Sequence, residues 1–442
     1  MKKLLYISIL CLLAASCNIT DVEPQNSISA TEAFKTKADI EKGILGAYAS
    51  FQSLSYYGRT FPIFADLAAD NLSHPVDATA VEYTEVDNNN ILPENGSNSN
   101  MWSIMYDGIN VANNVISKVP IIKDMTQEEK DVALAELYFI RALNHFNLTR
   151  YYGAIPLKLE PTVGVNNLDA PRVPVDEVYA QIITDLSFAV ENLPSSASKI
   201  RASKFGAKAL LAKVYLYEEN YQQAATMASE VINSGGYSLL PNYADVFADE
   251  ENAESIFEIS FSEMERNRIA EYNFPKSLNG RREVKPSQGL LDTYEDDDER
   301  FTASVAFSDN LAYAIKYDDL NLGAGNFIVI RLADMYLIRA EALAKGPAPD
   351  ANQIKADLNT IRTRAGLSNT TANGIGQLIS AIEKERRVEF AFEGHRWFDL
   401  VRTGRAIDVL TNVNNVNQTL FPIPFDELQT NNDPSMVQNP GY

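Results

Sequence analysis

The feature that most restricts the fold of this chain is a helical period of apolar residues that recurs along most of its length. In the block 33–51, apolar side chains follow one another at spacings of three and four, which places them on one face of a helix, and Thr31 is positioned to cap it. Further blocks with the same stripe are 102–119, 128–151, 175–193, 204–218, 222–234, 330–345, 352–364 and 375–402. The alternation of apolar and polar residues that is typical of β-strands occurs in only a few short stretches. The sequence therefore predicts a mainly α protein.

Some of these helices are predicted to form tetratricopeptide-like pairs, in which small side chains let two antiparallel helices approach closely. The spacing of such a unit is followed by Ala212, Tyr215, Tyr221, Ala224 and Ala228. The segment 333–366 predicts a second pair, with alanines on both of its helices. Earlier blocks fit the pattern only loosely, so an irregular helical bundle is the alternative.

Two long polar regions, about 70–100 and 237–326, interrupt the helical blocks and are rich in Asn, Asp, Gly, Ser and Tyr. Long loops inside a compact body are commonly functional. Sugar binding needs aromatic faces for stacking, together with Asn, Asp and Arg side chains that hydrogen-bond to hydroxyl groups. The predicted ligand-binding residues are Asp70, Asn71, Tyr83, Asn88, Asn89, Tyr272, Phe274, Arg281, Tyr294, Tyr313 and Tyr317. Taken singly, each also fits a packed aromatic or a turn residue, so the prediction rests on the set.

The N-terminus predicts export from the cytoplasm. Two lysines precede an apolar run, 4–15, which is shorter than the roughly 20 residues that span a bilayer and has the layout of a secretory signal. Cys17 follows small residues in an arrangement that resembles a bacterial lipobox, and an ordinary signal peptide cut near Ala15 is the alternative. The predicted organisation is a signal peptide at 1–16, a lipidated N-terminus and tether at 17–30, and one helical domain at 31–442.

Charge and residue usage exclude several functions. Asp and Glu number 59 against 38 Lys and Arg, and the formal charge of −21 repels nucleic-acid phosphates. With only Cys11, Cys17 and three histidines, the sequence predicts no metal site and no cofactor, although oxygen-rich loops could take up calcium. His145 lies between apolar neighbours on a helix, so it is expected to be packed.

Enzymatic function is not expected, because neither a nucleophile elbow nor a phosphate-binding glycine loop is present. The acidic run 295–299 contains paired carboxylates, and a lipid-anchored glycosidase that uses loop carboxylates is therefore the enzymatic alternative. Adjacent acids in a run are more typical of a solvated loop, which is the prediction for this segment.

The C-terminal quarter carries the most specific pattern. Its ordered series is Arg331, Asp334, Tyr336, Arg339, Glu341, Asn359, Arg362, Arg364, Glu385, Arg386, Glu389, Gly394, Trp397, Phe398, Asp399, Arg402, Pro422, Pro424 and Pro440. Together with Cys17, this series resembles the SusD/RagB family of Bacteroidetes outer-membrane lipoproteins. Members of that family are tetratricopeptide-containing helical proteins at the cell surface. They bind nutrient ligands, usually oligosaccharides, and cover a TonB-dependent transporter of the SusC type.

The resemblance therefore implies a SusD-like body with long ligand-binding loops, lipid-anchored at the outer membrane and facing the cell exterior. It implies a protein that binds an oligosaccharide and delivers it to a SusC-like transporter. Capture of a peptide, as in a RagB-like protein, is the alternative within the family, and a structural subunit with a dispensable ligand site is another.

The signature residues themselves are expected to build the body. Helical spacing predicts ion pairs of Glu383 with Arg387 and of Arg386 with Glu389. The two tryptophans, Trp102 and Trp397, fall in predicted framework helices, so a tryptophan platform of the starch-binding type is not expected. A stacking or cation–π role for one of these tryptophans would require an exposed ring.

Overall fold

The computed structural model describes residues 34–162, 164, 168–196 and 198–442, and these are mostly helical with a few short strands. The predicted signal peptide, Cys17 and the tether up to residue 30 lie outside the described residues. The long helices are α2 (Lys37–Ala49), α5 (Gly96–Lys118), α6 (Gln127–Tyr152), α7 (Val175–Asn192), α8 (Lys204–Tyr217), α9 (Tyr221–Ile232), α14 (Leu332–Lys345), α15 (Ala351–Arg364) and α16 (Ile375–Glu389). They follow the predicted blocks, which confirms the mainly α fold. Within the described ranges, no helix combines the length and the apolar character needed to cross a membrane.

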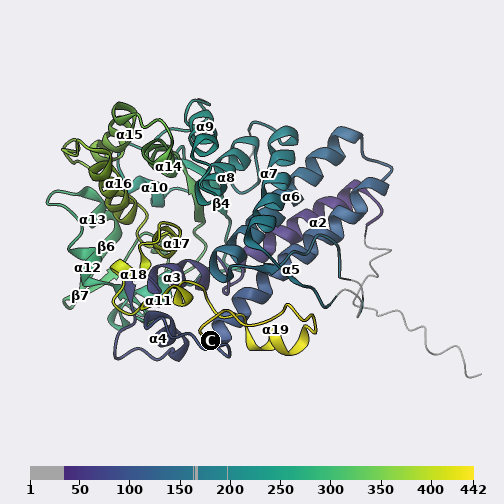
Figure 1. Cartoon of the computed structure of the whole chain (residues 1–442), viewed down its shortest axis with the longest axis horizontal. Helices are drawn as coiled ribbons and strands as arrows, with labels where there is room; N and C mark the ends of the chain where they lie inside the picture. The colour runs from purple at the N-terminus through teal and green to yellow at the C-terminus, as the bar shows by residue number, and fades with distance from the viewer. Residues whose placement is uncertain (1–33, 163, 165–167, 197) are drawn as a thin grey trace, which may run out of the picture.

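Long helices pack against their neighbours in chain order, from α2, α5, α6 and α7 at one end of the molecule through α8, α9, α14 and α15 (Figure 1). Helices α8 and α9 are separated only by residues 218–220, so they run in opposite directions. Ala212, Ala224 and Ala228 are fully buried, as the predicted close approach of this pair requires. The tetratricopeptide-like pairing is thereby confirmed, and α14 with α15 forms the second pair.

The hydrophobic core consists of two clusters that share α14. The larger cluster takes Leu332, Met335 and Ile338 from this helix and extends over α2 to α9. The smaller one takes Ala333 and Leu337 from the same helix and is completed by α15 and α16. Opposite faces of one helix thus belong to different clusters, which explains why α14 is buried almost throughout.

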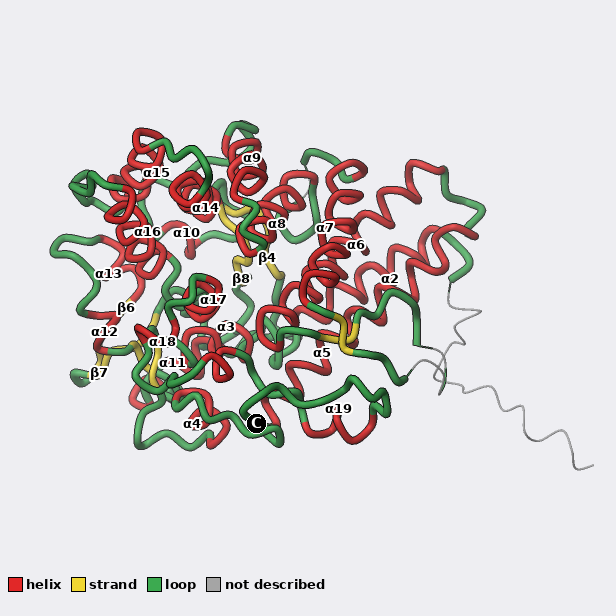
Figure 2. The backbone as a smooth tube through the Cα atoms, viewed as in Figure 1, coloured by secondary structure: helices red, strands yellow, loops and turns green. Residues whose placement is uncertain are grey.

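The strands form antiparallel pairs, two of which join segments far apart in the sequence (Figure 2). They pair as β1 (Leu72–Ser73) with β5 (Lys285–Pro286), β2 (Ile155–Pro156) with β3 (Arg172–Val173), β4 (Ser255–Ile259) with β8 (Phe327–Arg331), and β6 (Val305–Ser308) with β7 (Leu311–Ala314). The β1–β5 ladder joins the two polar regions that the sequence singled out. Between β6 and β7, Asp309 and Asn310 both have positive φ angles (52° and 62°), as a tight two-residue hairpin turn requires.

Short helices occupy the polar regions and the C-terminal segment. They are α3 (Thr60–Leu67), α4 (Val81–Asp87), α10 (Asp245–Ala248), α11 (Ile269–Asn273), α12 (Gln288–Leu291), α13 (Glu299–Ser304), α17 (Arg396–Arg402), α18 (Ala406–Val409) and α19 (Phe425–Thr430). The predicted block 375–402 is divided between α16 and α17 by a turn at Phe392 and Gly394, both of which have positive φ. A side chain at Gly394 would lie 2.8 Å from the Cα atom of Pro62, so this corner also needs a glycine for space.

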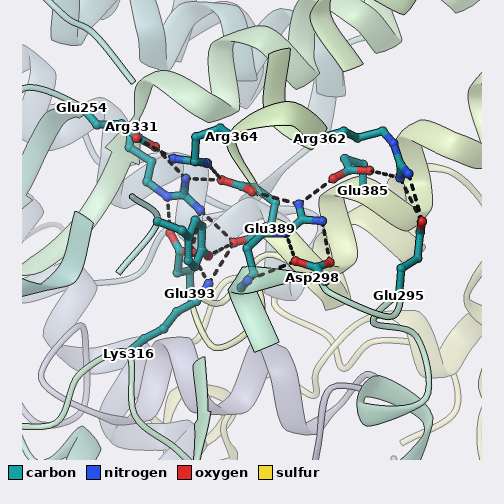
Figure 3. Close-up of polar contacts among 12 residues, drawn as sticks. Glu254, Glu295, Asp298, Lys316, Arg331, Arg362, Arg364, Glu385, Glu389 and Glu393 are labelled. Atoms are coloured by element: carbon teal, nitrogen blue, oxygen red, sulfur yellow. Dashed lines mark hydrogen bonds and ion pairs between the residues drawn. The ribbon is translucent and has the colours of Figure 1, made fainter. Parts of the chain in front are cut away.

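Arginines and glutamates of the C-terminal signature take part in a buried ion-pair network (Figure 3). The carboxylate of Glu389 is fully buried and accepts hydrogen bonds from Arg331 at 2.6 Å, from Arg300 at 3.1 Å and from Arg364. Burial alone would raise the pKa of Glu389, but these guanidinium groups outweigh it and hold the pKa well below its usual range. Further members of the network are Glu254, Asp298, Lys316, Glu385 and Glu393.

The structural role predicted for the signature is confirmed, although the predicted pairs are wrong. Arg387 contacts Asp70 at 3.0 Å and not Glu383, whereas Arg386 contacts Asp334 at 2.9 Å and Asp399 at 2.8 Å. The arginines of α16 lie against acids on neighbouring elements. They therefore pair with those acids and not with glutamates of their own helix.

The two tryptophans are framework residues, as predicted. Trp397 is fully buried, and Trp102 is packed against Tyr152 with their ring centres 4.8 Å apart. A stacking role for either ring is therefore excluded. His145 is also buried, and desolvation lowers its pKa to about 3, which confirms the packed histidine.

The acidic run 295–299 differs in part from the predicted solvated loop. Asp296 and Asp297 are exposed, but Asp298 is buried on Arg300 at 2.8 Å, and Glu295 contacts Arg362 at 2.9 Å. Arg362 on α15 holds Glu295, and Asp298 caps the N-terminus of α13, the helix that contains Arg300. Two of the five acids therefore belong to the framework.

Candidate ligand-binding site

Three loop segments that are far apart in the sequence meet at one place on the molecule. They are residues 74–83, 269–284 and 305–314. The buried carboxylate of Glu283 accepts hydrogen bonds from the backbone nitrogens of Thr79 (2.9 Å) and Ala80 (3.0 Å). Burial would raise the pKa of Glu283, but these donors outweigh it and lower the pKa. Arg282 adds an ion pair with Asp77 at 2.7 Å, so the first and second polar regions are firmly joined.

Tyr272 lies at the centre of this junction, between two arginines. The Cζ atoms of Arg59 and Arg281 lie 4.6 Å and 4.8 Å from the centre of its ring, and Arg59 donates a hydrogen bond of 2.8 Å to its hydroxyl group. The ring of Tyr83 lies 5.6 Å away on the inner side. Tyr272 and Tyr83 are only 6% and 2% exposed, so neither ring presents a face to a ligand in this structure. The predicted stacking role of these two rings is not supported, because the arginines and the core cover them.

The partly exposed rings at the junction are Phe274 and Tyr313. Their ring centres are 4.8 Å apart, and the two rings are tilted by 60°. The Arg281 side chain, which lies over the ring of Tyr272, is 43% exposed. These residues combine aromatic surface with hydrogen-bond donors that can reach a ligand, which is the combination that sugar recognition uses.

One exposed aromatic residue was missed by the sequence reasoning. Phe307 on β6 is 55% exposed and pairs with Ala312, whereas Tyr313 pairs with Ala306, so the two rings lie on opposite faces of the hairpin. The alternation around the Asp309–Asn310 turn would have indicated this hairpin and its two aromatic faces.

Two of the predicted ligand contacts instead brace the corner at α16 and α17. Asp70 contacts Arg396 at 2.7 Å as well as Arg387, and Asn71 is buried and donates a hydrogen bond of 2.9 Å to Asp66. Their polar groups are engaged by the framework, so the structure does not support their predicted role as ligand contacts.

The remaining predicted residues are separated from the junction or are covered. Asn89 is buried with a positive φ angle of 47°, and its amide donates to the carbonyl of Ala68, while Asn88 is exposed at the end of α4. Tyr294 packs on Phe301 and Tyr317 on Phe327, with ring centres 5.4 Å and 4.8 Å apart. Of the eleven candidates, the structure therefore brings together Tyr83, Tyr272, Phe274, Arg281 and Tyr313.

The main hollows of the surface also combine rings with polar side chains, but none of their lining residues belongs to the three loop segments. An open groove of about 1010 Å³ along α9 is lined mainly by apolar side chains of α8, α9 and α14. A cavity of about 160 Å³ beside Tyr317 is lined by acids and amides, including Glu258 and Asn326, which hydrogen-bond to each other at 2.8 Å. No group of three or more His, Cys, Asp or Glu side chains in the described part of the chain is arranged to hold a metal ion.

Comparison with known proteins gives consistent matches along the whole chain. Residues 316–442 match the model of the SusD family, and residues 20–216 match a family described as starch-binding and associating with the outer membrane. SusD-like protein P2 of Formosa agariphila is 28% identical and is matched over 98% of both chains, and SusD-like protein P38 of the same organism is 27% identical over the full length of both. A solved laminarin-binding SusD-like protein is 29% identical with a TM-score of 0.83, covering 92% of this chain and 100% of that one. A SusD superfamily protein from Bacteroides vulgatus is 25% identical with a TM-score of 0.82 and the same coverage.

Proposed function

The chain belongs to the SusD family, and from this premise we propose that it is a surface lipoprotein that binds an oligosaccharide. We propose further that it delivers this ligand to a SusC-like TonB-dependent transporter for uptake across the outer membrane. The junction of the three loop segments carries the proposal, since it offers partly exposed rings and a guanidinium group. The laminarin-binding relative of the same fold supports a glycan as the ligand.

The carboxylates at the junction favour binding over hydrolysis. A glycosidase needs one carboxylic acid and one carboxylate, both free to act on either side of a glycosidic bond. Here Glu283 is buried and held by the backbone of residues 79–80, and Asp77 is paired with Arg282. We therefore propose a non-enzymatic protein without a cofactor, and a lipid-anchored glycosidase is the less favoured alternative.

Replacing Tyr313 by Ala is expected to weaken glycan binding by about twofold to tenfold, because a stacked ring contributes about 0.5–1.5 kcal/mol beyond its buried area. The measurement is native affinity electrophoresis of the protein without residues 1–17 in gels that contain different polysaccharides. Tyr215→Ala is the matched control, because Tyr215 is a partly exposed ring on α8, away from the junction.

The same assay separates the alternatives. Equal retardation of the wild type and of Tyr313→Ala would contradict the placement of the site. Binding to peptide mixtures but to no glycan would favour the peptide-capturing function, and release of reducing sugar by the purified protein would favour the glycosidase.

Replacing Cys17 by Ala is expected to move the protein from the membrane fraction to the soluble fraction, because the thiol that would carry the acyl chains is lost. Fractionation of cells that express the full chain, followed by immunoblotting, measures this. Cys11→Ala is the control, since Cys11 lies within the predicted signal peptide. Retention of the Cys17 variant on membranes at wild-type levels would show that the anchor is assigned wrongly.

A further inference from the structure

We propose that the ligand of the loop junction is an anionic glycan, one whose sugar units carry carboxylate or sulfate groups. The inference rests on the proposed function and adds the chemical class of the ligand. Three observations carry it: the local charge of the second loop segment, an arginine without an acidic partner, and the free donors of Arg281.

The second loop segment and its flanks are basic, whereas the first and third segments contribute acids, namely Asp77, Glu82 and Asp309. Residues 266–285 contain six Lys and Arg against two Glu, a formal charge of +4, in a chain whose formal charge is −21. Such an acidic protein repels an anionic polymer over most of its surface. A basic segment that coincides with the rings of the proposed site would offset this repulsion and orient the polymer.

Arg59 supplies a further positive charge at the junction. It is only partly exposed, and it hydrogen-bonds to the hydroxyl groups of Tyr272 and Thr60, but no carboxylate among the described residues pairs with it. Guanidinium groups withdrawn from water are usually paired with an anion. Some buried arginines of this protein, such as Arg331 and Arg300, are held by several carboxylates, whereas the partly buried Arg150 resembles Arg59 in having none within the described ranges. The charge of Arg59 is therefore not neutralised by an acid of the described part of the chain and could pair with an anionic ligand.

Arg281 adds a second donor group at the same ring. Only its Nη2 atom contacts Glu283, at 3.1 Å, and in the described structure no protein acceptor lies on its Nε or Nη1 atoms. Glu283 is already held by three donors from residues 79–80, so its charge is compensated largely without Arg281. A guanidinium group can bind a carboxylate or a sulfate through two parallel hydrogen bonds, which gives both strength and orientation. The partly exposed rings of Phe274 and Tyr313 would meanwhile contact the faces of the sugars.

The test compares polymers that share a backbone and differ only in charge. Polygalacturonate is paired with its methyl ester, a sulfated galactan with its desulfated form, and laminarin serves as a further neutral probe. Affinity electrophoresis of the protein without residues 1–17 should show at least tenfold tighter binding to one charged member than to its neutral counterpart. The preferred pair then distinguishes a carboxylate ligand from a sulfate ligand.

Variants that each remove one positive charge test which arginines bind the charged polymer. Arg281→Gln and Arg59→Gln should each weaken binding of the preferred charged polymer by about tenfold, while Arg281→Lys should retain part of it. Arg405→Gln is the matched control, because its side chain is 46% exposed and its acidic contacts, Glu383 and Asp408, lie outside the three loop segments. Binding of the charged polymer should also weaken as the salt concentration rises.

The outcomes separate this inference from the function on which it rests. Binding of neutral polymers alone would overturn the anionic preference and leave the proposed glycan-binding function in place. Binding of a charged polymer that survives both Arg→Gln changes would overturn the assignment to Arg59 and Arg281. No binding to any polymer would contradict the proposed function itself.

Discussion

Replacing Glu389 by Ala is expected to lower the free energy of unfolding by about 3–5 kcal/mol, because it leaves buried guanidinium groups without the carboxylate they share. Glu389 lies at the centre of the network, and its three arginine partners come from α13, α15 and the end of β8. The change therefore loosens several elements at once. Urea unfolding of the protein without residues 1–17, followed by circular dichroism, measures the difference.

Glu94→Ala is the control for this experiment, because Glu94 is exposed and makes no ion pair among the described residues. It should change the free energy of unfolding by less than about 0.5 kcal/mol. If Glu389→Ala does not fold, Glu389→Gln keeps the shape and some hydrogen bonds and should show a smaller loss. A loss below about 1 kcal/mol in both Glu389 variants would contradict the role of the network.

Acid should destabilise the protein steeply between about pH 4 and pH 2. Burial alone would raise the pKa values of Asp334 and Glu341, but Lys213 and Arg386 beside Asp334, and Arg402 beside Glu341, lower both to about 2. In the unfolded chain these carboxyls have pKa values of about 4. A lowered folded pKa gives stability that is complete above the unfolded value and is lost as the pH falls through the folded value. Each group contributes about 2–3 kcal/mol.

Urea unfolding at pH 7, 5, 4, 3 and 2.5 measures this dependence. Glu341→Gln is expected to be less stable at pH 7 and to lose less stability on acidification, because one of the titrating groups is gone. Asp66 acts in the opposite direction: burial raises its pKa to about 7, so its contribution is present at low pH and is lost as the pH rises. Equal free energies of unfolding at pH 7 and pH 2.5 would refute the predicted balance.

The helices could be predicted from the sequence because their signal is local. The spacing of Ala212, Ala224 and Ala228 also predicted which faces of α8 and α9 meet, and these faces are buried. The ion pairs of α16 could not be predicted in the same way. Arg387 hydrogen-bonds to the carbonyl of Asp70, which is 317 residues away, and no local pattern contains that information.

The aromatic and polar residues of the candidate site could be proposed from the sequence, but their arrangement in space could not. The two polar regions do meet, and Phe274, Arg281 and Tyr313 lie together where they meet. Composition does not say on which side of a loop a ring lies, so Tyr83, which packs against Phe64 in the core, was predicted alongside exposed rings. The role of Arg59 was missed because it stands outside both polar regions and depends on its position beside Tyr272.

The β1–β5 ladder and the hydrogen bonds of Glu283 fix the loops of the junction before any ligand arrives. Binding to a mobile loop is opposed by the conformational entropy that the loop loses on ordering. Because these segments are already ordered, that opposing term is small, and a few ring and guanidinium contacts suffice for useful affinity. The same ordered surface would meet each ligand in one fixed arrangement, which would suit the transfer to a transporter that we propose for this protein.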